Sequence, residues 1–277
     1  MNPSNDNTKI EAPEATSSTA GGERLSLRRL EQLADQLPAR DFDILRDLET
    51  RRYMTSGQIA RKYFSHASQR SANYVIQRLN QHGLINPLAR RIGGVKGGSK
   101  GFVWSLTTAG YRLLHLHGEA IPRRRAFEPS PRFVEHTLAL TELDLQLRGI
   151  DDIMVTEVQF EPDCWRDHGG SKLKPDMFAI TTSGKYEDYW FFELDLDTET
   201  AACILGKCRQ YQSYYRTNAE QRKHGVFPLV VWVVPNERRR DSLLDHIRQS
   251  TELHQKNLFT VIMPDELEAL IRKGATQ

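Results

Sequence analysis

Two stretches in the second half of the chain place acidic side chains where they can act together. Asp176 opens the apolar stretch MFAI, and Glu193 lies near the end of the aromatic stretch YWFFELDLD. Alternate residues of a strand share a face, so Glu193, Asp195 and Asp197 are expected in line on one face. Carboxylates this close need cations or solvent to offset their repulsion. An Asp at a strand start and an acid on the next strand converge on one divalent ion, and such oxygen ligands suit Mg²⁺ or Mn²⁺. We therefore predict a Mg²⁺ or Mn²⁺ site formed by Asp176, Glu193 and Asp195.

The elements expected around these carboxylates alternate between helices and strands. Strands are predicted over residues 153–160, 174–182, 188–198, 227–235 and 258–264. Helices are predicted over 133–149, 200–217, 241–249 and 265–272, the last capped by Asp265, and a polar loop is expected over 161–173. The nearly all-apolar FPLVVWVVP indicates a strand that is buried on both faces of a sheet. This order predicts a three-layer α/β domain around a mixed sheet over residues 132–277.

The acidic stretches resemble the core of the PD-(D/E)XK nuclease-like superfamily. The resemblance rests on a Pro-Asp pair at 175–176, sixteen intervening residues, and Glu-Leu-Asp at 193–195. The preceding helix with Glu135 and the helix after the strand also follow the order of that fold. The resemblance implies that Asp176 and Glu193 hold a metal ion. It also implies a Lys two residues after the Glu, which positions or activates the attacking water.

That lysine is replaced by Asp195 here, which is a clear departure from the superfamily pattern. A replacement is expected from elsewhere in the chain, and Lys207 on the next helix is the first candidate. Gln210 and Tyr211 follow it one turn further on. Lys174, beside the Pro-Asp pair, is the weaker candidate. The resemblance thus implies Asp176, Glu193 and Lys207 as the catalytic set.

Positive charge is concentrated in the first half of the chain. Between Arg51 and Gly118 there are eleven Lys and Arg residues and no Asp or Glu. Because the whole chain carries a net charge of +2, the remainder carries −9. A basic module joined to an acidic remainder indicates a polyanionic partner for the first part.

The pattern of this basic part predicts a winged helix-turn-helix over residues 24–118. A polar tail over 1–23 precedes it, and a Pro- and Arg-rich linker over 119–131 follows it. Helices are expected over 24–38, from residue 39, from the N-cap Ser56, over 69–82 and from Thr107 or Thr108. Strands are expected at 84–85 and 101–106, joined by a glycine-rich wing over 88–100. The fold class is therefore a two-domain α+β or α/β protein.

The helix over 69–82 is the expected recognition helix, because the second helix of such a motif enters the major groove. Arg reaches guanine and Asn or Gln reaches adenine, so its exposed residues suit base reading. The predicted DNA contacts on this helix are Gln69, Arg70, Ser71, Asn73, Tyr74, Gln77 and Arg78. The wing adds Arg90, Arg91, Lys96 and Lys100 for phosphates or the minor groove. The alternative is a winged helix that contacts protein.

The whole combination resembles the replication-relaxation family of bacterial plasmids and integrated mobile elements. The resembling features are ARDFDIL, LTTAGYRLL, EHTLAL, KPDMFAI, and FELDLDTET followed by Lys207 and Tyr211, over about residues 38–235. Membership implies a role in plasmid DNA relaxation, replication or transfer, with double-stranded DNA and relaxase or replication proteins as partners. It does not by itself establish catalysis.

Three functions therefore remain open. The first is a DNA-binding accessory factor for plasmid or mobile-element processing. The second is a metal-dependent endonuclease or nickase, and the third is a transcriptional repressor whose second domain forms a homodimer. A tyrosine nucleophile at Tyr211 or Tyr214 ranks low, because His115, His117 and His136 do not form the metal-binding cluster that relaxases use.

The sparse cysteines and the absence of long apolar runs indicate a cytoplasmic location. Cys164, Cys203 and Cys208 form neither a CxxC pair nor an even set, so reduced thiols are expected. No apolar run approaches the length that spans a membrane, and the first residues lack the apolar core of a signal peptide.

Overall fold

The structure is a computed structural model that describes residues 25–88, 102–119 and 129–275. Its helices are α1 (Leu27–Gln36), α2 (Ala39–Arg51), α3 (Ser56–Tyr63), α4 (Gln69–Gln81), α5 (Thr108–Leu116), α6 (Pro131–Arg148), α7 (Ala201–Tyr215), α8 (Ala219–His224), α9 (Glu237–Gln249) and α10 (Leu267–Lys273). Its strands are β1 (Met54–Thr55), β2 (Ile85–Pro87), β3 (Val103–Leu106), β4 (Met154–Phe160), β5 (Arg166–His168), β6 (Ser171–Leu173), β7 (Met177–Ser183), β8 (Tyr186–Leu194), β9 (Leu229–Val233) and β10 (Phe259–Ile262). The predicted wing contacts Arg90, Arg91, Lys96 and Lys100 lie outside the described residues, as do most of the tail and linker.

The first part of the chain combines α1–α5 with a small antiparallel sheet in the order β1-β3-β2. Helix α3 begins one residue earlier than expected, because Thr55 and not Ser56 is its N-cap. The Thr55 hydroxyl accepts from the Gln58 backbone N–H, and the Gln58 side chain accepts from the Thr55 N–H. Two orphan donors are thereby satisfied reciprocally. Helix α4 ends where expected, with Gly83 at φ 68°, a conformation that glycine adopts without strain.

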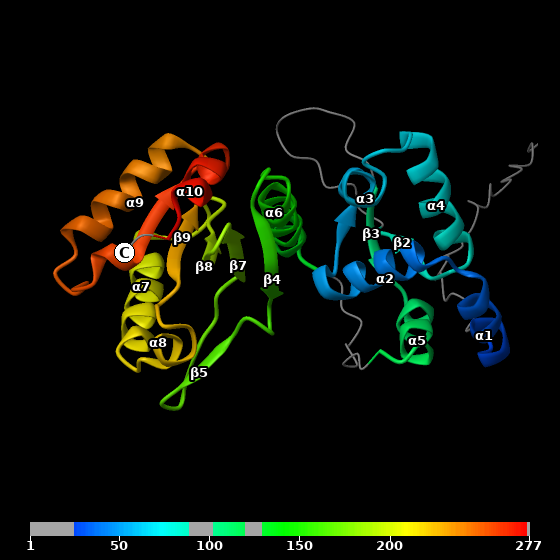
Figure 1. Cartoon of the computed structure of the whole chain (residues 1–277), viewed down its shortest axis with the longest axis horizontal. Helices are drawn as coiled ribbons and strands as arrows, with labels where there is room; N and C mark the ends of the chain where they lie inside the picture. Colours follow the sequence, from blue (N-terminus) through cyan, green and yellow to red (C-terminus); the bar gives the residue numbers. More distant parts are fainter. Residues whose placement is uncertain (1–24, 89–101, 120–128, 276–277) are drawn as a thin grey trace, which may run out of the picture.

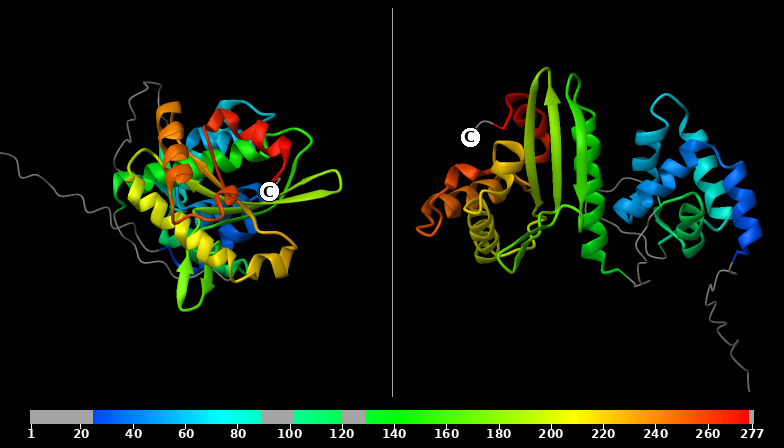
Figure 2. Two further views of the ribbon diagram at one scale, coloured as in Figure 1. Left: turned by 90° about the vertical axis from the view of Figure 1, so that its left-hand side faces the viewer. Right: turned by 60° about the horizontal axis from the view of Figure 1, so that its bottom comes forward.

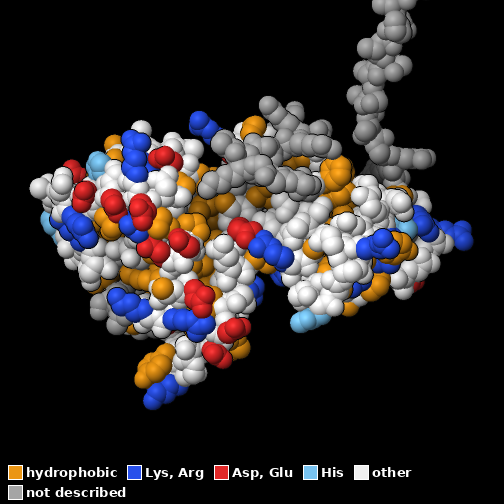
Figure 3. All heavy atoms as spheres, turned by 90° about the horizontal axis from the view of Figure 1, so that it is seen from above, with side chains coloured by type: hydrophobic (Ala, Val, Ile, Leu, Met, Phe, Trp, Pro, Cys, Tyr) orange, Lys and Arg blue, Asp and Glu red, His pale blue; other side chains and the backbone are white. Residues whose placement is uncertain are grey.

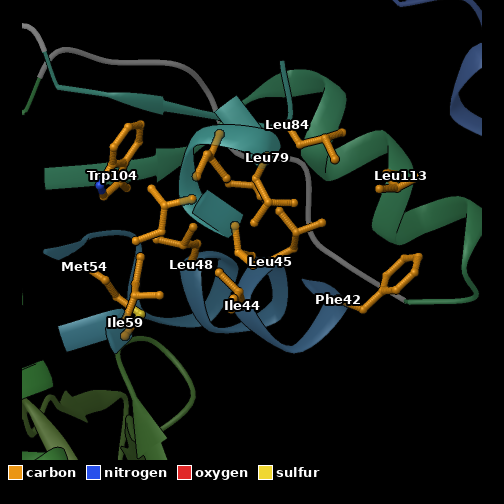
Figure 4. Close-up of a cluster of buried hydrophobic side chains, with 14 of the residues drawn as sticks. Phe42, Ile44, Leu45, Leu48, Met54, Ile59, Leu79, Leu84, Trp104 and Leu113 are labelled. Carbon is orange, nitrogen blue, oxygen red and sulfur yellow. The ribbon is translucent and has the colours of Figure 1, made fainter. Parts of the chain in front are cut away.

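One apolar core holds these helices and strands together (Figure 4). Its fully buried side chains include Ile44, Leu45 and Leu48 of α2, Ile59 of α3, Leu79 of α4 and Trp104 of β3. The i, i+3, i+4 spacing of the α2 residues turns one face of that helix inward. The face of α4 that points away from this core therefore remains exposed to solvent.

The second part is built on a five-stranded mixed sheet in the order β10-β9-β8-β7-β4. Strands β8, β9 and β10 run parallel, whereas β7 and β4 are antiparallel to their neighbours. Every residue of β9 is buried, as the apolar run predicts. The α/β class and the mixed sheet expected from the sequence are thus confirmed.

Helices cover both faces of this sheet (Figures 1 and 2). Alternate residues of β8 enter two separate cores, Phe191 on the side of α7 and α9 and Phe192 on the side of α6 and α10. Residues of β8 on the α7 side therefore share a layer with α7, and this layer contains the functional groups considered below.

The structure differs from expectation at two places that border these groups. The loop expected over 161–173 contains the hairpin β5–β6, whose turn is Gly169-Gly170 with φ 51° and 79°. Strand β8 ends at Leu194, so Asp195 and Asp197 lie beyond it. The prediction of three carboxylates in line along one strand is therefore wrong, because β8 ends at Leu194 and the backbone turns at Asp197, whose φ is 61°.

Helix α6 lies between the two parts of the chain (Figure 1). On α3, the Gln58 amide donates to the Leu138 carbonyl oxygen at 2.9 Å, and Arg61 forms an ion pair with Glu142. Tyr53, Val103 and Val134 form a small apolar cluster beside these contacts. A single helix thus contacts both the α1–α5 unit and the sheet.

Candidate functional site

Asp176 lies immediately before β7, at the end of the sheet where β7 begins and β8 finishes. Its side chain turns toward β8, where its Oδ2 accepts a hydrogen bond from the Leu194 backbone N–H at 2.7 Å. The residue is 8% exposed. Because β7 and β8 are neighbours, this bond brings the Asp176 carboxylate beside the last residues of β8.

Glu193 is fully buried on the face of β8 that α7 covers. Its Oε1 accepts a hydrogen bond from the Tyr211 hydroxyl at 2.5 Å. Its Oε2 forms an ion pair with the Lys207 ammonium. Since Lys207 and Tyr211 are four residues apart on α7, their side chains lie on one face of that helix.

Lys207 joins the two carboxylates into one cluster. Its Nζ lies 3.6 Å from Asp176 Oδ1, in addition to its contact with Glu193. Helix α7 is set in place by Thr200, whose side chain accepts from the Cys203 backbone N–H at the N-cap. The three residues that the sequence proposed as a catalytic set therefore lie together, although their catalysis remains a prediction.

Burial and neighbouring charges both shift the pKa values of the groups in this cluster. Burial is the largest influence on Glu193 and raises the pKa of its carboxyl well above the ordinary value, against the opposing charge of Lys207. Burial acts in the same direction on Asp176, but the charge of Lys207 and the contact with His136 outweigh it and lower the pKa. Lys207 thus lies between two carboxyls whose pKa values are shifted in opposite directions, that of Asp176 downward and that of Glu193 upward.

His136 is a fourth member that sequence reasoning missed. Its Nε2 lies 3.5 Å from Asp176 Oδ1. Burial opposes protonation of this imidazole, but the contact with Asp176 and its charge outweigh burial and raise the pKa. A signal was present, because His136 shares helical spacing with Leu140, Leu143 and Leu147, which pack on the sheet.

The other predicted members of the site lie elsewhere. Asp195 accepts a hydrogen bond from Arg239 Nε on α9 at 2.5 Å and does not face Asp176. Lys174 lies over the Trp165 ring, with its Nζ 4.6 Å from the centroid. Asp195 is the first residue after the end of β8. Neither Asp195 nor Lys174 belongs to the cluster of Asp176, Glu193 and Lys207.

Asp176 and Glu193 offer the carboxylate oxygens that a hard divalent ion prefers. Each turns one oxygen toward the same ammonium, and Mg²⁺ is commonly held by only one or two carboxylates plus waters and phosphates. Burial, together with the charge of Asp176, raises the pKa of Glu193 although Lys207 opposes this shift. Within the described ranges, no three side chains among His, Cys, Asp and Glu are arranged around a metal position. Asp195 therefore does not fit as a third ligand.

Two of the three tyrosines on α7 donate to buried carboxylates. Tyr211 donates to Glu193 and Tyr214 donates to Glu220 Oε1 at 2.7 Å. Burial and these carboxylates raise the pKa of both phenols. A raised pKa makes a phenol a poorer nucleophile. Attack by a tyrosine therefore remains the least favoured of the mechanisms considered.

The predicted recognition helix α4 exposes most of its predicted contacts. The exposed members are Gln69, Arg70, Ser71, Asn73, Tyr74 and Gln77. Tyr74 is 68% exposed, which is unusual for an aromatic side chain on a packed helix. Arg78 differs from expectation, because its guanidinium forms an ion pair with the fully buried Asp41 of α2. A buried carboxylate needs a cation, and Arg78 supplies it.

The charge bias of the first part is smaller in space than along the chain. Asp47 of α2 contacts both Arg51 and Lys62, and Glu142 and Asp144 of α6 contact Arg61 and Arg51. These acids all lie outside residues 51–118 in sequence. In Figure 3, red and blue side chains are interspersed over the sheet-bearing half, whereas blue side chains predominate on the visible face of the α1–α5 half.

The fold and the site together define an α/β protein in which a mixed sheet and one covering helix enclose a carboxylate pair with a lysine. The chain belongs to the replication-relaxation family, whose model matches residues 45–230. That span includes α3, α4 and the cluster from His136 to Tyr211. The family expected from the sequence is thus confirmed, and it indicates a role in replication or mobile-element DNA processing. No curated protein and no solved structure matches the chain.

No helix among the described residues is long and apolar enough to cross a membrane.

Proposed function

We propose that this protein binds double-stranded DNA through α4 and acts in plasmid or mobile-element DNA relaxation, replication or transfer, beside relaxase or replication proteins. The order α2, α3, α4, β2 and β3 supports a winged helix-turn-helix in which α4 is the recognition helix. The observation that carries the proposal is the outward face of α4. It displays a run of amide, hydroxyl and guanidinium groups that suit base edges and phosphates.

The test is the affinity for duplex DNA of a variant with Arg70→Ala, Asn73→Ala and Gln77→Ala. These side chains are exposed, so the variant is expected to fold as the wild type does. Affinity is expected to fall by at least about tenfold, since one good base contact is worth about 1–3 kcal/mol. Fluorescence anisotropy over a salt series measures both affinity and the number of phosphate contacts.

The matched control carries Arg28→Ala and Gln36→Ala on the exposed surface of α1. It removes similar groups from another helix of the same unit and is expected to leave affinity within about twofold. Equal affinities of the two variants would exclude α4 as the DNA-binding helix. Genome-wide footprinting separates the roles, because a processing factor occupies an origin whereas a repressor occupies promoters.

A second candidate function is a metal-dependent DNA endonuclease or nickase. The observation that favours it is the convergence of Lys207 with Asp176 and Glu193 from three separate elements. The order of α6, β4, β7, β8, α7 and β9 supports a PD-(D/E)XK-like core, with Lys207 in place of the lysine that the motif lacks.

In this proposal Asp176 and Glu193 hold the Mg²⁺ or Mn²⁺. When bound, such an ion polarises a phosphodiester and lowers the pKa of a bound water. Lys207 offsets the carboxylate charge and offers its ammonium to a phosphate oxygen. Tyr211 orients Glu193 by donating to its Oε1, and the Leu194 N–H orients Asp176 in the same manner.

Nicking of supercoiled plasmid with Mg²⁺ or Mn²⁺ tests this function. Asp176→Asn and Glu193→Gln preserve shape and are expected to abolish nicking, whereas Asp163→Asn alters an exposed carboxylate and is expected to retain it. Plasmid that stays intact with the wild-type protein across metals and DNA substrates would exclude cleavage.

A further inference from the structure

A small crevice lies where the end of α2, helix α6 and the end of β4 meet. Its lining includes Arg51 at the end of α2 and the following Arg52, His136 and Thr137 from α6, and Glu161 after β4. The cavity measures about 30 Å³. This space is enough for one small polar group, since roughly 10–15 Å³ suffices to hold a water molecule. The crevice therefore admits one oxygen of a larger ligand that stays at the rim.

Arg52 is held in this crevice by an uncommon backbone conformation. It caps α2 at φ 69° and ψ −44°, a region that residues other than glycine rarely occupy. Such outliers concentrate at functional sites, where the surrounding structure enforces them. The guanidinium lies over the Phe133 ring, 5.2 Å from its centroid, and no carboxylate pairs with it among the described residues. Its charge is therefore available to an anion.

Arg51 adds buried donors to the same crevice. Only 5% of it is exposed, and its Nη2 donates to Asp144 at 2.6 Å. Its Nη1 is buried without a hydrogen-bond partner in the described part of the chain. An unpaired buried N–H of a charged group is costly, so an acceptor in the crevice is favoured. Glu161, the acid in the lining, accepts a hydrogen bond from Trp165 Nε1 at 3.3 Å.

The crevice also borders the carboxylate–lysine cluster. His136 lines it and lies 3.5 Å from Asp176, so a group bound there sits next to the site with Lys207. The other side of the crevice is formed by the end of α2, which belongs to the same α1–α5 unit as α4. A nucleic-acid strand running from that unit to the sheet would pass this point.

We propose that this crevice binds one non-bridging oxygen of a nucleic-acid backbone phosphate, with Arg52 as the principal cation and Arg51 Nη1 as a buried donor. The inference rests on the proposed nucleic-acid function and names the path by which a strand reaches Asp176 and Glu193. Arg52 and Arg51 are positioning residues here, because they hold a phosphate beside the cluster and do not belong to it.

The test is calorimetric titration of the full chain with a thymidine tetranucleotide, in chelator so that the strand stays intact. This ligand is too short to span the duplex surface of α4. Arg52→Gly is the main variant, because glycine accepts the backbone conformation and removes the guanidinium. Its affinity for the tetranucleotide is expected to be about tenfold weaker, which is typical of a lost charge-assisted hydrogen bond. Arg52→Lys is expected to recover part of it.

Three comparisons make the outcome decisive. Arg132→Ala, an exposed arginine in the first turn of α6, is expected to leave affinity unchanged. A tetranucleotide with neutral methylphosphonate linkages is expected not to bind. Inorganic phosphate is expected to bind more weakly than the tetranucleotide.

Equal tetranucleotide affinity in the wild type and in Arg52→Gly overturns the inference. Binding of inorganic phosphate at least as tight as that of the tetranucleotide overturns the backbone assignment in favour of free phosphate. The α4 triple variant is expected to keep tetranucleotide affinity. Loss of duplex binding or absence of nicking, with Arg52-dependent tetranucleotide binding retained, would then count against the proposed function alone.

Discussion

The α1–α5 unit and the sheet-based cluster both contain many charged side chains, but they arrange them in opposite ways. Around the sheet, Lys207 lies between Asp176 and Glu193, and all three are largely enclosed. In the α1–α5 unit, cations on α2, α3 and α4 pair with single carboxylates of other segments, as Arg51, Arg61 and Arg78 do, while the outer face of α4 keeps mostly neutral polar groups and Arg70.

This difference shows that charge counted along a chain is a poor guide to charge in space. The acid-free run from 51 to 118 suggested a strongly basic surface, yet Arg51, Arg61 and Arg78 each contact a carboxylate from another segment. The acidic remainder of the chain, in turn, supplied the environment that holds a buried lysine. Variants at each region should therefore differ in the size of their effect on folding.

The largest expected effect is that of Lys207→Ala. It leaves Glu193, which is fully buried, and Asp176 without their shared cation. Breaking a buried ion pair from one side costs about 3–5 kcal/mol in free energy of unfolding. Urea denaturation measures this loss. Adding Glu193→Gln to the same chain is expected to restore part of the stability, because it removes one uncompensated carboxylate.

The matched control for that prediction is Lys223→Ala, an exposed lysine on α8. Surface substitutions of this kind stay within about 0.5 kcal/mol. A Lys207→Ala loss no greater than that of Lys223→Ala would mean that the cluster is solvated, contrary to its burial.

A smaller but substantial loss is expected for Arg51→Met in the basic unit. The variant keeps an apolar stem and removes the bond to Asp144, which is fully buried. Asp144 retains Arg148 Nε at 2.9 Å, so one of its two cations survives. We expect a loss of about 2 kcal/mol, the usual value of a hydrogen bond to a charged group. Thermal and urea unfolding that show no change would assign Arg51 to ligand binding alone.

Helices and strands could be predicted well from the sequence. The partners that side chains contact in distant segments could be predicted only poorly. The strands bearing Asp176 and Glu193 and the helix bearing Lys207 were all expected, because apolar runs and turn residues mark them locally. The contact of Asp195 with Arg239 was not, because it depends on where α9 comes to lie. The β5–β6 hairpin was missed because its strands are polar, although Gly169-Gly170 is a recognised hairpin turn signal.

Acid should weaken the α1–α5 unit partly through Asp47. Burial favours the neutral form of this carboxyl, but the charges of Arg51 and Lys62 outweigh burial and lower its pKa. A carboxyl whose pKa is depressed by folding stabilises the protein above its unfolded pKa, and this contribution is lost as pH falls through the folded pKa. The loss of stability is therefore expected below about pH 4.

The Asp47→Asn variant is expected to be less stable than the wild type at pH 7 and to lose less stability on acidification, as urea midpoints at several pH values would show. Parallel pH curves for the two proteins would contradict this.

The smallest effect is expected at the Arg61–Glu142 pair, which joins α3 to α6 in solvent. Its side chains are 53% and 36% exposed, against 4% and 0% for Arg51 and Asp144. Exposed pairs contribute about 0.2–1 kcal/mol and weaken with salt, because water and ions screen them. Double-mutant cycles with alanine at both pairs, run at low and high salt, compare them directly. The coupling of Arg61 with Glu142 should be several times smaller than that of Arg51 with Asp144 and should fade with salt. A coupling at the exposed pair that matched the buried one, or that persisted at high salt, would contradict this ranking by exposure.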